Sequence, residues 1–163
     1  MMKRTPESKL LSREGLRNQF GPQRDMQLVF TNGCFDVLHP GHVSYLNEAR
    51  SLGDVLIVGI NSDASVRLLD KGPGRPVMNE FDRAFMVAAL ESVDAVCVFD
   101  DDTPVELISE IVPDVLVKGA DYTLEEVVGR EIVENAGGRV GLIPLHKDYS
   151  STNLIIRIRE AYE

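Results

Sequence analysis

The segment from Leu28 to Tyr45, LVFTNGCFDVLHPGHVSY, decides how the chain is organised. An apolar, β-branched run leads into a glycine-bearing turn, and the sequence H-P-G-H then opens a helical pattern. A helix N-terminus carries unpaired N–H donors and partial positive charge, so a strand that leads into one is suited to hold an anion. The segment therefore predicts a strand, an anion-binding turn and a helix, with His39 and His42 at the mouth of the site.

Short β-branched runs and longer amphipathic runs alternate from Met26 onward. They predict strands over 27–32, 54–60, 95–99, 115–119 and 139–145. They predict helices over 41–51, 62–69, 79–91, 103–111, 124–136 and 152–162. This alternation indicates an α/β fold, a Rossmann-like, doubly wound sheet of five parallel strands with helices on both faces. Such sheets bind ligands beyond the carboxyl ends of their strands.

Several element boundaries have a local chemical reason. Asn79 and Thr103 each stand just before a helical pattern and are expected to be N-caps. Glu106 follows Thr103 at the spacing of a capping box. The pair Gly137 and Gly138 is expected to end the helix that precedes it.

The N-terminal residues 1–25 are polar and irregular, with a short helical pattern over 8–19. They are predicted to form a peripheral arm, and residues 26–163 are predicted to form the single α/β domain. A chain of 163 residues is long enough for one domain with a sizeable core. The two cysteines, Cys34 and Cys97, form no CxxC pair, so a disulfide framework is not expected.

Composition excludes several classes of partner. The formal charge of −9 and the pI of about 4.8 argue against a surface that binds nucleic acid through many phosphate contacts. No apolar run approaches the roughly 18 residues that a membrane span needs. The first residues, MMKRTPESKLL, are too polar for a secretory signal. We therefore expect a cytoplasmic protein that binds no membrane and no nucleic acid.

The H-P-G-H sequence is the strongest candidate for chemistry. Pro40 suits the first turn of a helix, and Gly41 allows a ligand to approach the backbone closely. His39 and His42 would then face the ligand, where imidazoles can donate hydrogen bonds to phosphate oxygens as charge develops in a transition state.

Two rival chemistries use the same residues. Cys34, His39 and His42 could form a zinc site, but a structural site wants four ligands and no fourth has convincing spacing. Cys34 could instead be a nucleophile activated by a histidine. Asp36 is better interpreted as holding the turn or a histidine than as a general base. The chain has neither GxxxxGK[ST] nor a GxGxxG after its first strand, which disfavours a P-loop NTPase and dinucleotide binding of the usual Rossmann kind.

Two further segments could hold anions. Residues 70–77, DKGPGRPV, carry two basic side chains on a stretch whose glycines and prolines forbid regular structure, so they form either a functional loop or a plain surface connection. Residues 149–153, YSSTN, lead directly into an amphipathic helix. Their three consecutive hydroxyls serve either as an N-cap or as a second phosphate cradle.

Together these motifs resemble a known family. GCFDVLHPGH resembles the HxGH signature of the nucleotidyltransferase superfamily, and YSSTNLI resembles its late ISTT motif. The segments TNGCFDVLHPGH, VGINSDASV, KGPGRPV, ALESVDAV, DTPVELI, PDVLVKGADY and STNLIIRI are similar to the adenylyltransferases that form ADP-heptose from ATP and D-glycero-D-manno-heptose 1-phosphate. The resemblance implies that a sugar phosphate oxygen attacks the α-phosphorus of ATP and that Mg²⁺-bound pyrophosphate leaves.

The same resemblance implies roles for individual residues. His39, His42 and Lys71 would act on the reacting phosphates, with Mg²⁺ bound through ATP and no metal ligand from the protein. The residues implied to bind the nucleotide are Thr31, Asn32, Gly33, Cys34, Phe35, Gly41, Arg83, Lys118, Gly119, Asp121, Ser150, Ser151 and Thr152. Those implied to bind the acceptor are Asp36, Asn61 and Arg75. Arg83 would support phosphate or loop geometry, and Lys118 would border the ribose and base.

The chain departs from the family pattern in two respects. Related cytidylyltransferases carry RTEG before ISTT, whereas this chain has Leu145 in place of the arginine, which leaves His146 or Lys147 as substitutes. No sugar kinase is fused to the domain, so a stand-alone transferase is expected, with a homodimer as the family-level expectation. The alternatives are transfer to another phosphate, as in a glycerol 3-phosphate cytidylyltransferase, and a non-catalytic nucleotide-binding module.

Overall fold

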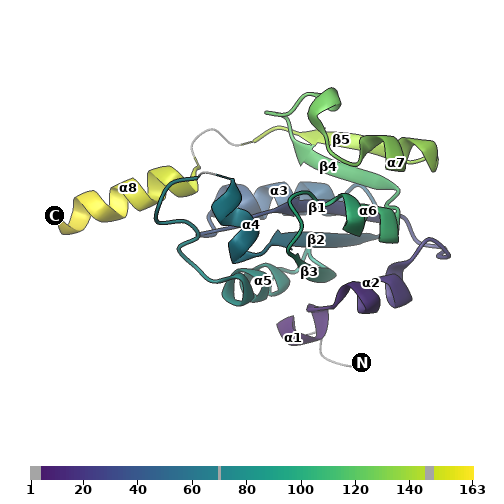
Figure 1. Cartoon of the computed structure of the whole chain (residues 1–163), viewed down its shortest axis with the longest axis horizontal. Coiled ribbons are helices and arrows are strands. Elements are labelled where there is room, and N and C mark those ends of the chain that lie inside the picture. The colour runs from purple at the N-terminus through teal and green to yellow at the C-terminus, as the bar shows by residue number, and fades with distance from the viewer. Residues whose placement is uncertain (1–4, 70, 146–148) are drawn as a thin grey trace.

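The computed structural model describes residues 5–69, 71–145 and 149–163, and its centre is one parallel sheet (Figure 1). The sheet is formed by β1 (Leu28–Gly33), β2 (Val55–Asn61), β3 (Ala95–Phe99), β4 (Val115–Gly119) and β5 (Arg139–Ile143). Their order is β3-β2-β1-β4-β5, and each neighbouring pair is parallel. The fold class expected from the alternating pattern is therefore confirmed.

Helices cover both faces of this sheet. They are α1 (Pro6–Lys9), α2 (Arg13–Phe20), α3 (Pro40–Arg50), α4 (Asp63–Leu68), α5 (Glu80–Ala88), α6 (Val105–Ile111), the 3₁₀ turn η1 (Leu124–Glu126), α7 (Arg130–Asn135) and α8 (Ser151–Tyr162). Side chains alternate along each strand, so one strand supplies two cores. In β2, Ile57 packs in a cluster with α2, α6 and α7, whereas Leu56 and Val58 pack in a second cluster with α3 and α5.

The N-terminal arm contributes to the first of these cores. Leu16 and Phe20 of α2 are buried in the cluster, and Leu10 forms an isolated parallel bridge with Val96 of β3. The helical pattern expected over 8–19 is in fact two short helices, each with its own N-cap side chain. The described part of the arm thus lies against the sheet, and the domain boundary at residue 25 stays a prediction.

Two of the expected helix ends are confirmed: Asn79 caps α5, and Gly137 follows α7 with a positive φ. The expected N-cap at Thr103 and its capping box with Glu106 were wrong. Pro104, with ψ near 10°, occupies the N-cap position of α6, so the helix begins one residue too late for the Thr103 box.

The helix expected over 124–136 is interrupted. The backbone becomes extended at Val127, whose side chain is buried in the core, and Gly129 takes a positive φ where a Cβ would meet Ile108 of α6 at 2.6 Å. Packing against α6 therefore overrides helical continuity.

Aspartates close the amino-terminal edge of the sheet. Asp54, Asp94 and Asp114 each stand immediately before a strand. Each accepts a hydrogen bond from a backbone N–H at or next to the start of the neighbouring strand, at 2.8, 3.0 and 2.7 Å. Asp114 also accepts from Arg24 Nη2 at 2.9 Å. Part of the negative charge is thus fixed at the edge opposite the predicted site.

The C-terminal helix α8 extends away from the sheet (Figure 1). None of its residues is buried. Among the described residues, no helix is both long and apolar enough to cross a membrane.

Candidate active site

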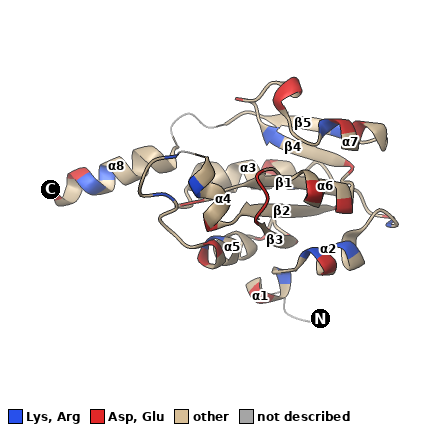
Figure 2. Cartoon of the chain, viewed as in Figure 1, with Lys and Arg blue, Asp and Glu red and all other residues tan. Residues whose placement is uncertain are grey.

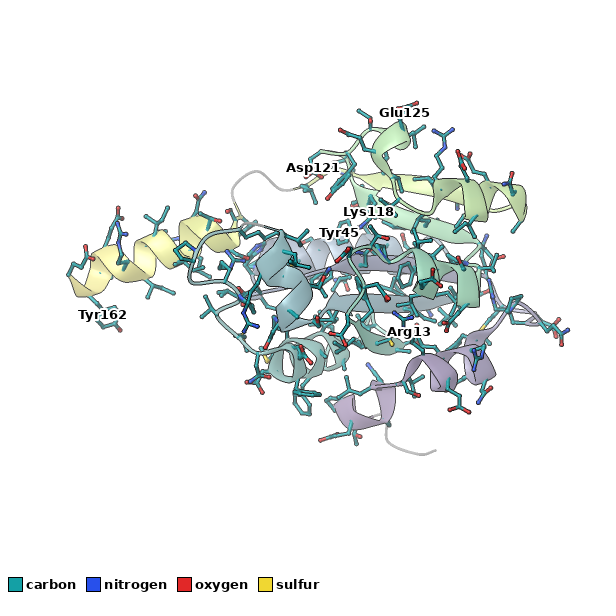
Figure 3. All side chains as sticks on the ribbon, in the orientation of Figure 1. Arg13, Tyr45, Lys118, Asp121, Glu125 and Tyr162 are labelled. Carbon is teal, nitrogen blue, oxygen red and sulfur yellow. The ribbon has the colours of Figure 1, made fainter. Side chains whose placement is uncertain are left out.

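A cavity of about 570 Å³ opens at the carboxyl edge of the sheet, beyond the ends of β1 and β4. It is lined by Asn32, Gly33, Cys34, Phe35, Asp36, His39, Gly41, His42, Tyr45, Lys71, Arg75, Lys118, Gly119, Asp121, Tyr122, Leu145, Tyr149, Ser150, Ser151 and Thr152. Figure 3 shows Lys118, Asp121 and Tyr45 around the end of β4. All but three of the residues predicted for the site therefore lie together.

The three exceptions are buried and lie outside the cavity lining. Thr31 donates to the Val117 carbonyl at 3.0 Å, and its hydroxyl lies 2.8 Å from that of Tyr45. Asn61 donates to Ser65 Oγ at 2.8 Å. These groups therefore act on the scaffold.

Arg83, the third exception, is fully buried in α5. It donates to the Cys34 carbonyl at 2.6 Å, the Met78 carbonyl at 3.0 Å and Asp63 Oδ1 at 2.8 Å. Of the two roles that the resemblance implied for Arg83, these contacts support loop geometry: the guanidinium ties the first loop to residue 78.

The two histidines stand at the start of α3 as a stacked pair. Their ring centroids are 3.7 Å apart with an interplanar angle of 18°, and the His39 backbone N–H donates to His42 Nδ1 at 3.4 Å. Because Nδ1 of His42 accepts this bond, the proton of a neutral His42 resides on Nε2 and is available to donate. The Phe35 ring is tilted against the His42 ring, with 5.3 Å between the ring centroids.

Both histidines favour the neutral form. Burial, together with the nearby charges of His39, Lys71 and Arg75, lowers the pKa of His42 to about 4. Burial also lowers the pKa of His39 below its ordinary value. The pair therefore offers neutral hydrogen-bond donors, and the positive charge of the site comes from the lysines, the arginine and the helix ends.

Lys118 lies on the opposite wall, at the end of β4. Its Nζ donates to Asn32 Oδ1 at 2.6 Å and lies 5.6 Å from the centre of the Tyr122 ring. Burial lowers the pKa of Lys118 to about 8, although the neighbouring Asp121 acts in the opposite direction. Lys118 is thus a cation held in place by Asn32 whose charge is sensitive to mildly alkaline pH.

The helix α8 brings the hydroxyl cluster to the same cavity. Ser150 is its N-cap and accepts from the Asn153 N–H at 3.4 Å. Ser151 Oγ donates to the Asp36 carbonyl at 2.7 Å, which fixes the start of α8 against the first loop. At Gly41 a Cβ would meet Tyr149 at 2.9 Å, so only glycine lets the two helix starts approach this closely. Two helix N-termini therefore converge on one cavity.

Four lining residues were not predicted as site residues: Tyr45, Tyr122, Leu145 and Tyr149. Tyr45 lies one helical turn after His42, a spacing that could have placed it on the same face. Tyr149 stacks on His39 at 6.2 Å and belongs to the YSSTN motif. Tyr122 and Leu145 follow strand ends, where only the loop conformation decides which way a side chain faces.

No group of three or more His, Cys, Asp and Glu side chains suited to a metal ion occurs among the described residues. His146 and Lys147, the candidate substitutes for the missing arginine, lie outside the described residues. Asp36 borders the cavity, and its buried carboxylate accepts three hydrogen bonds.

Comparisons with known proteins agree with this geometry. A family model described as Cytidylyltransferase-like matches residues 30–158. The bifunctional protein HldE of Syntrophotalea carbinolica is 55% identical over 159 residues, which cover 96% of this chain and 32% of that protein. HldE of Trichlorobacter lovleyi is 53% identical over 161 residues, covering 98% of this chain and 33% of that protein. The chain thus spans about a third of the length of these relatives.

Solved structures show the same fold. The lipopolysaccharide core biosynthesis protein of Thermoplasma volcanium matches with a TM-score of 0.63 and 29% identity, covering 77% of this chain and 99% of that one. The pantoate-β-alanine ligase of Francisella tularensis has a TM-score of 0.59 at 14% identity, covering 92% of this chain and 76% of that one, and supports the fold alone. The fold is that of nucleotidyltransferase-type proteins. The chain belongs to the Cytidylyltransferase-like family, and the expected superfamily resemblance is confirmed.

Proposed function

We propose that this chain is an adenylyltransferase that transfers AMP from ATP to D-glycero-D-manno-heptose 1-phosphate, giving ADP-heptose and pyrophosphate. The observation that carries the proposal is the cavity in which two helix N-termini, a histidine pair and the cations Lys71, Arg75 and Lys118 converge. A site with this much positive potential and so few free carboxylates suits a triphosphate.

The reaction balances without a covalent enzyme intermediate. An oxygen of the sugar phosphate forms a bond to the α-phosphorus of ATP, and the bond from that phosphorus to the β-bridging oxygen breaks. Pyrophosphate leaves with the electron pair and with the Mg²⁺ that arrived on ATP. A phosphate monoester is already a nucleophile at neutral pH, so the site needs positioning and charge stabilisation more than it needs a base.

The side chains fit those two tasks. His42, neutral and with its donor on Nε2, can donate to a phosphate oxygen without moving a proton. His39, stacked on it, presents a second imidazole. The N-terminus of α8 supplies backbone N–H groups and the Thr152 hydroxyl for the distal phosphates, since the Ser151 hydroxyl is already used to hold Asp36.

The choice of heptose and adenine rests on similarity. The relatives are named HldE and are bifunctional, and one structural neighbour is named for lipopolysaccharide core biosynthesis. We infer that this chain corresponds to the part of HldE that transfers the nucleotide, and that its product serves lipopolysaccharide core or another heptose-containing surface glycan. A cytoplasmic location, where ATP is available, stays a prediction.

The test is pyrophosphate release with MgATP, MgCTP, MgGTP or MgUTP, each paired with heptose 1-phosphate, glycerol 3-phosphate or phosphopantetheine. We expect turnover with ATP and heptose 1-phosphate well above every other pair. Turnover with CTP and glycerol 3-phosphate instead would establish the alternative transferase. Tight ATP binding by calorimetry, with no release for any pair, would establish a non-catalytic nucleotide-binding module.

A homodimer is supported by the apolar face of α8. Leu154, Ile155, Ile158 and Tyr162 recur at helical spacing, and Ile158 and Tyr162 are 50% and 90% exposed. Sedimentation of the chain tests this proposal. We expect a dimer that Ile158→Glu converts to a monomer, and a monomeric wild type would refute it.

A further inference from the structure

We infer that Asp36 is a positioning residue that acts through Arg75: it orients the Arg75 guanidinium toward the phosphate end of the cavity. The inference rests on the proposed function for the nature of the ligand, a phosphoryl group. Asp36 itself would touch no substrate. Both residues border the cavity, but the Asp36 side chain has no exposed surface, whereas the Arg75 side chain is 12% exposed.

The first step is that the Asp36 carboxylate is fully occupied by one segment. It accepts from Arg75 Nε at 2.6 Å, from the Val77 N–H at 2.9 Å and from the Met78 N–H at 3.0 Å. Burial alone would raise the pKa of Asp36, but these three donors hold it below its ordinary value. Asp36 is therefore an anion at neutral pH, bound to the end of the loop that follows Lys71.

The second step is that the other end of this loop is open. Lys71 is exposed, and at Gly72 and Gly74 an added Cβ would meet nothing within 4 Å. The loop is thus attached at residues 75–78 and unsupported at residues 71–74. Because Asp36 binds the attached end of the loop, it controls the positions of the two cations on the loop, Lys71 and Arg75.

The third step concerns the free donors of Arg75. Only Nε bonds to Asp36, and its two Nη groups make no hydrogen bond to any described residue. The side chain is only 12% exposed and lies near enough to His42 to lower that residue's pKa. A guanidinium held through Nε presents two parallel donors in fixed geometry, which matches a phosphate.

The fourth step is that Asp36 links both phosphate-binding walls. Its own backbone carbonyl accepts from Ser151 at the start of α8, and its neighbour Cys34 accepts from Arg83, which also binds Met78. The first loop, the Lys71 loop and the start of α8 therefore meet at one residue. The carboxylate of Asp36 orients the Lys71 loop, and the backbone carbonyl of the same residue holds the start of α8.

A double-mutant cycle tests this inference. Asp36→Asn removes the negative charge and places an amide NH2 where one of the two carboxylate oxygens accepts its bonds, and Arg75→Gln removes the guanidinium. We expect each single variant to lose on the order of 10-fold or more in kcat/KM for pyrophosphate release, and the double variant to lose no more than Arg75→Gln alone. Losses that multiply, or an Asp36→Asn enzyme within twofold of the wild type, would overturn the inference.

A second readout needs no substrate, so it separates this inference from the proposed function. Trypsin can cut after Lys71, whereas Arg75 is followed by Pro76 and resists cleavage. We expect Asp36→Asn to be cut after Lys71 several-fold faster than the wild type. Asp114→Asn is the matched control, because Asp114 also binds an arginine and a backbone N–H, at the opposite edge. Equal cutting rates in both variants would contradict the inference.

Arg75→Lys tests whether the geometry of the Arg75 guanidinium matters, and this test remains available if Asp36→Asn does not fold. Lysine keeps the charge, but one ammonium cannot bind Asp36 and also present a planar pair of donors. We therefore expect Arg75→Lys to bind inorganic pyrophosphate in calorimetry as weakly as Arg75→Gln. Wild-type affinity in Arg75→Lys would show that only charge matters, and the inference would fall.

Discussion

The two edges of the sheet use the same residue types for opposite purposes. At the amino edge, Arg24 donates through Nη1 and Nη2 to four backbone carbonyls and to Asp114, and Asp114 also closes the end of β1. At the carboxyl edge, Arg75 donates to Asp36 through Nε alone, and Lys71 stands exposed in the cavity. The Nη groups of Arg24 are bonded, whereas those of Arg75 make no hydrogen bond to any residue that the structure describes.

The difference explains how an acidic protein can hold an anionic ligand. Acidic side chains are spread over the chain, as Figure 2 shows, and three aspartates are fixed at the amino edge by backbone bonds. Around the cavity the carboxylates are already paired, Asp36 with Arg75 and Asp121 beside Lys118. Net charge therefore says little about a site whose potential is set by local donors and helix ends.

Removing the histidines should have the largest effect on the carboxyl edge. His39→Ala and His42→Ala are each expected to lose on the order of 10²-fold or more in kcat with the melting temperature little changed, because a transition-state donor is lost. Steady-state kinetics and thermal melts measure the two quantities. Near wild-type turnover in both variants would show that the pair has no catalytic role.

Removing Arg24 should affect the amino edge alone. Arg24→Met leaves several carbonyls and Asp114 without their donor, so the free energy of unfolding is expected to fall by about 2 kcal/mol. Urea titration measures the loss, and kcat should stay within twofold of the wild type. A large fall in kcat in a folded Arg24→Met protein would mean that the two edges are not independent.

Lys118 should give the carboxyl edge a pH dependence. Its pKa of about 8 in the free protein means that its positive charge is lost as the pH rises through 8. We expect kcat/KM for ATP to fall by about 10-fold per pH unit above this value, because kcat/KM reports groups of the free enzyme. Lys118→Met should be low and flat over the same range. The same alkaline fall in Lys118→Met would assign it to another group.

The smallest effect is expected from Asp114 at the amino edge. Burial alone would raise its pKa, but the Leu28 N–H and Arg24 hold it below the ordinary value of 3.8. A carboxylate with a lowered folded pKa adds stability at neutral pH, which is lost as the pH falls from 3.8 through the folded value. Asp114→Asn should thus be less stable at pH 7 and lose less stability below pH 4 than the wild type. Parallel acid melts of the two proteins would contradict this.

Sequence patterns predicted the parts of this molecule that depend on short-range chemistry. The β-branched runs gave all five strands, and the motifs at His39 and Ser150 lie at helix starts that converge on one cavity because parallel strands end at one edge. Arg83 could not be placed in this way. Its partners Cys34 and Asp63 are distant in sequence, so the local pattern could not decide between the two roles that the resemblance implied for it, phosphate support and loop geometry.

Loop conformations were the other limit. Tyr122 and Leu145 line the cavity although nothing in their local sequence distinguishes a side chain that faces the ligand from one that faces solvent. The interruption at Val127 likewise depends on a close contact with α6 that no periodicity records. Such features are decided by tertiary packing.

The most direct test of the whole account is where two labels from ATP go. The purified chain is given ATP labelled at either the α- or the γ-phosphorus, with Mg²⁺ and heptose 1-phosphate, and the products are separated. The account predicts that the α-label enters the sugar nucleotide and that the γ-label is released in pyrophosphate. A γ-label transferred to the sugar, or an α-label that stays in free nucleotide, would contradict attack at the α-phosphorus in this cavity.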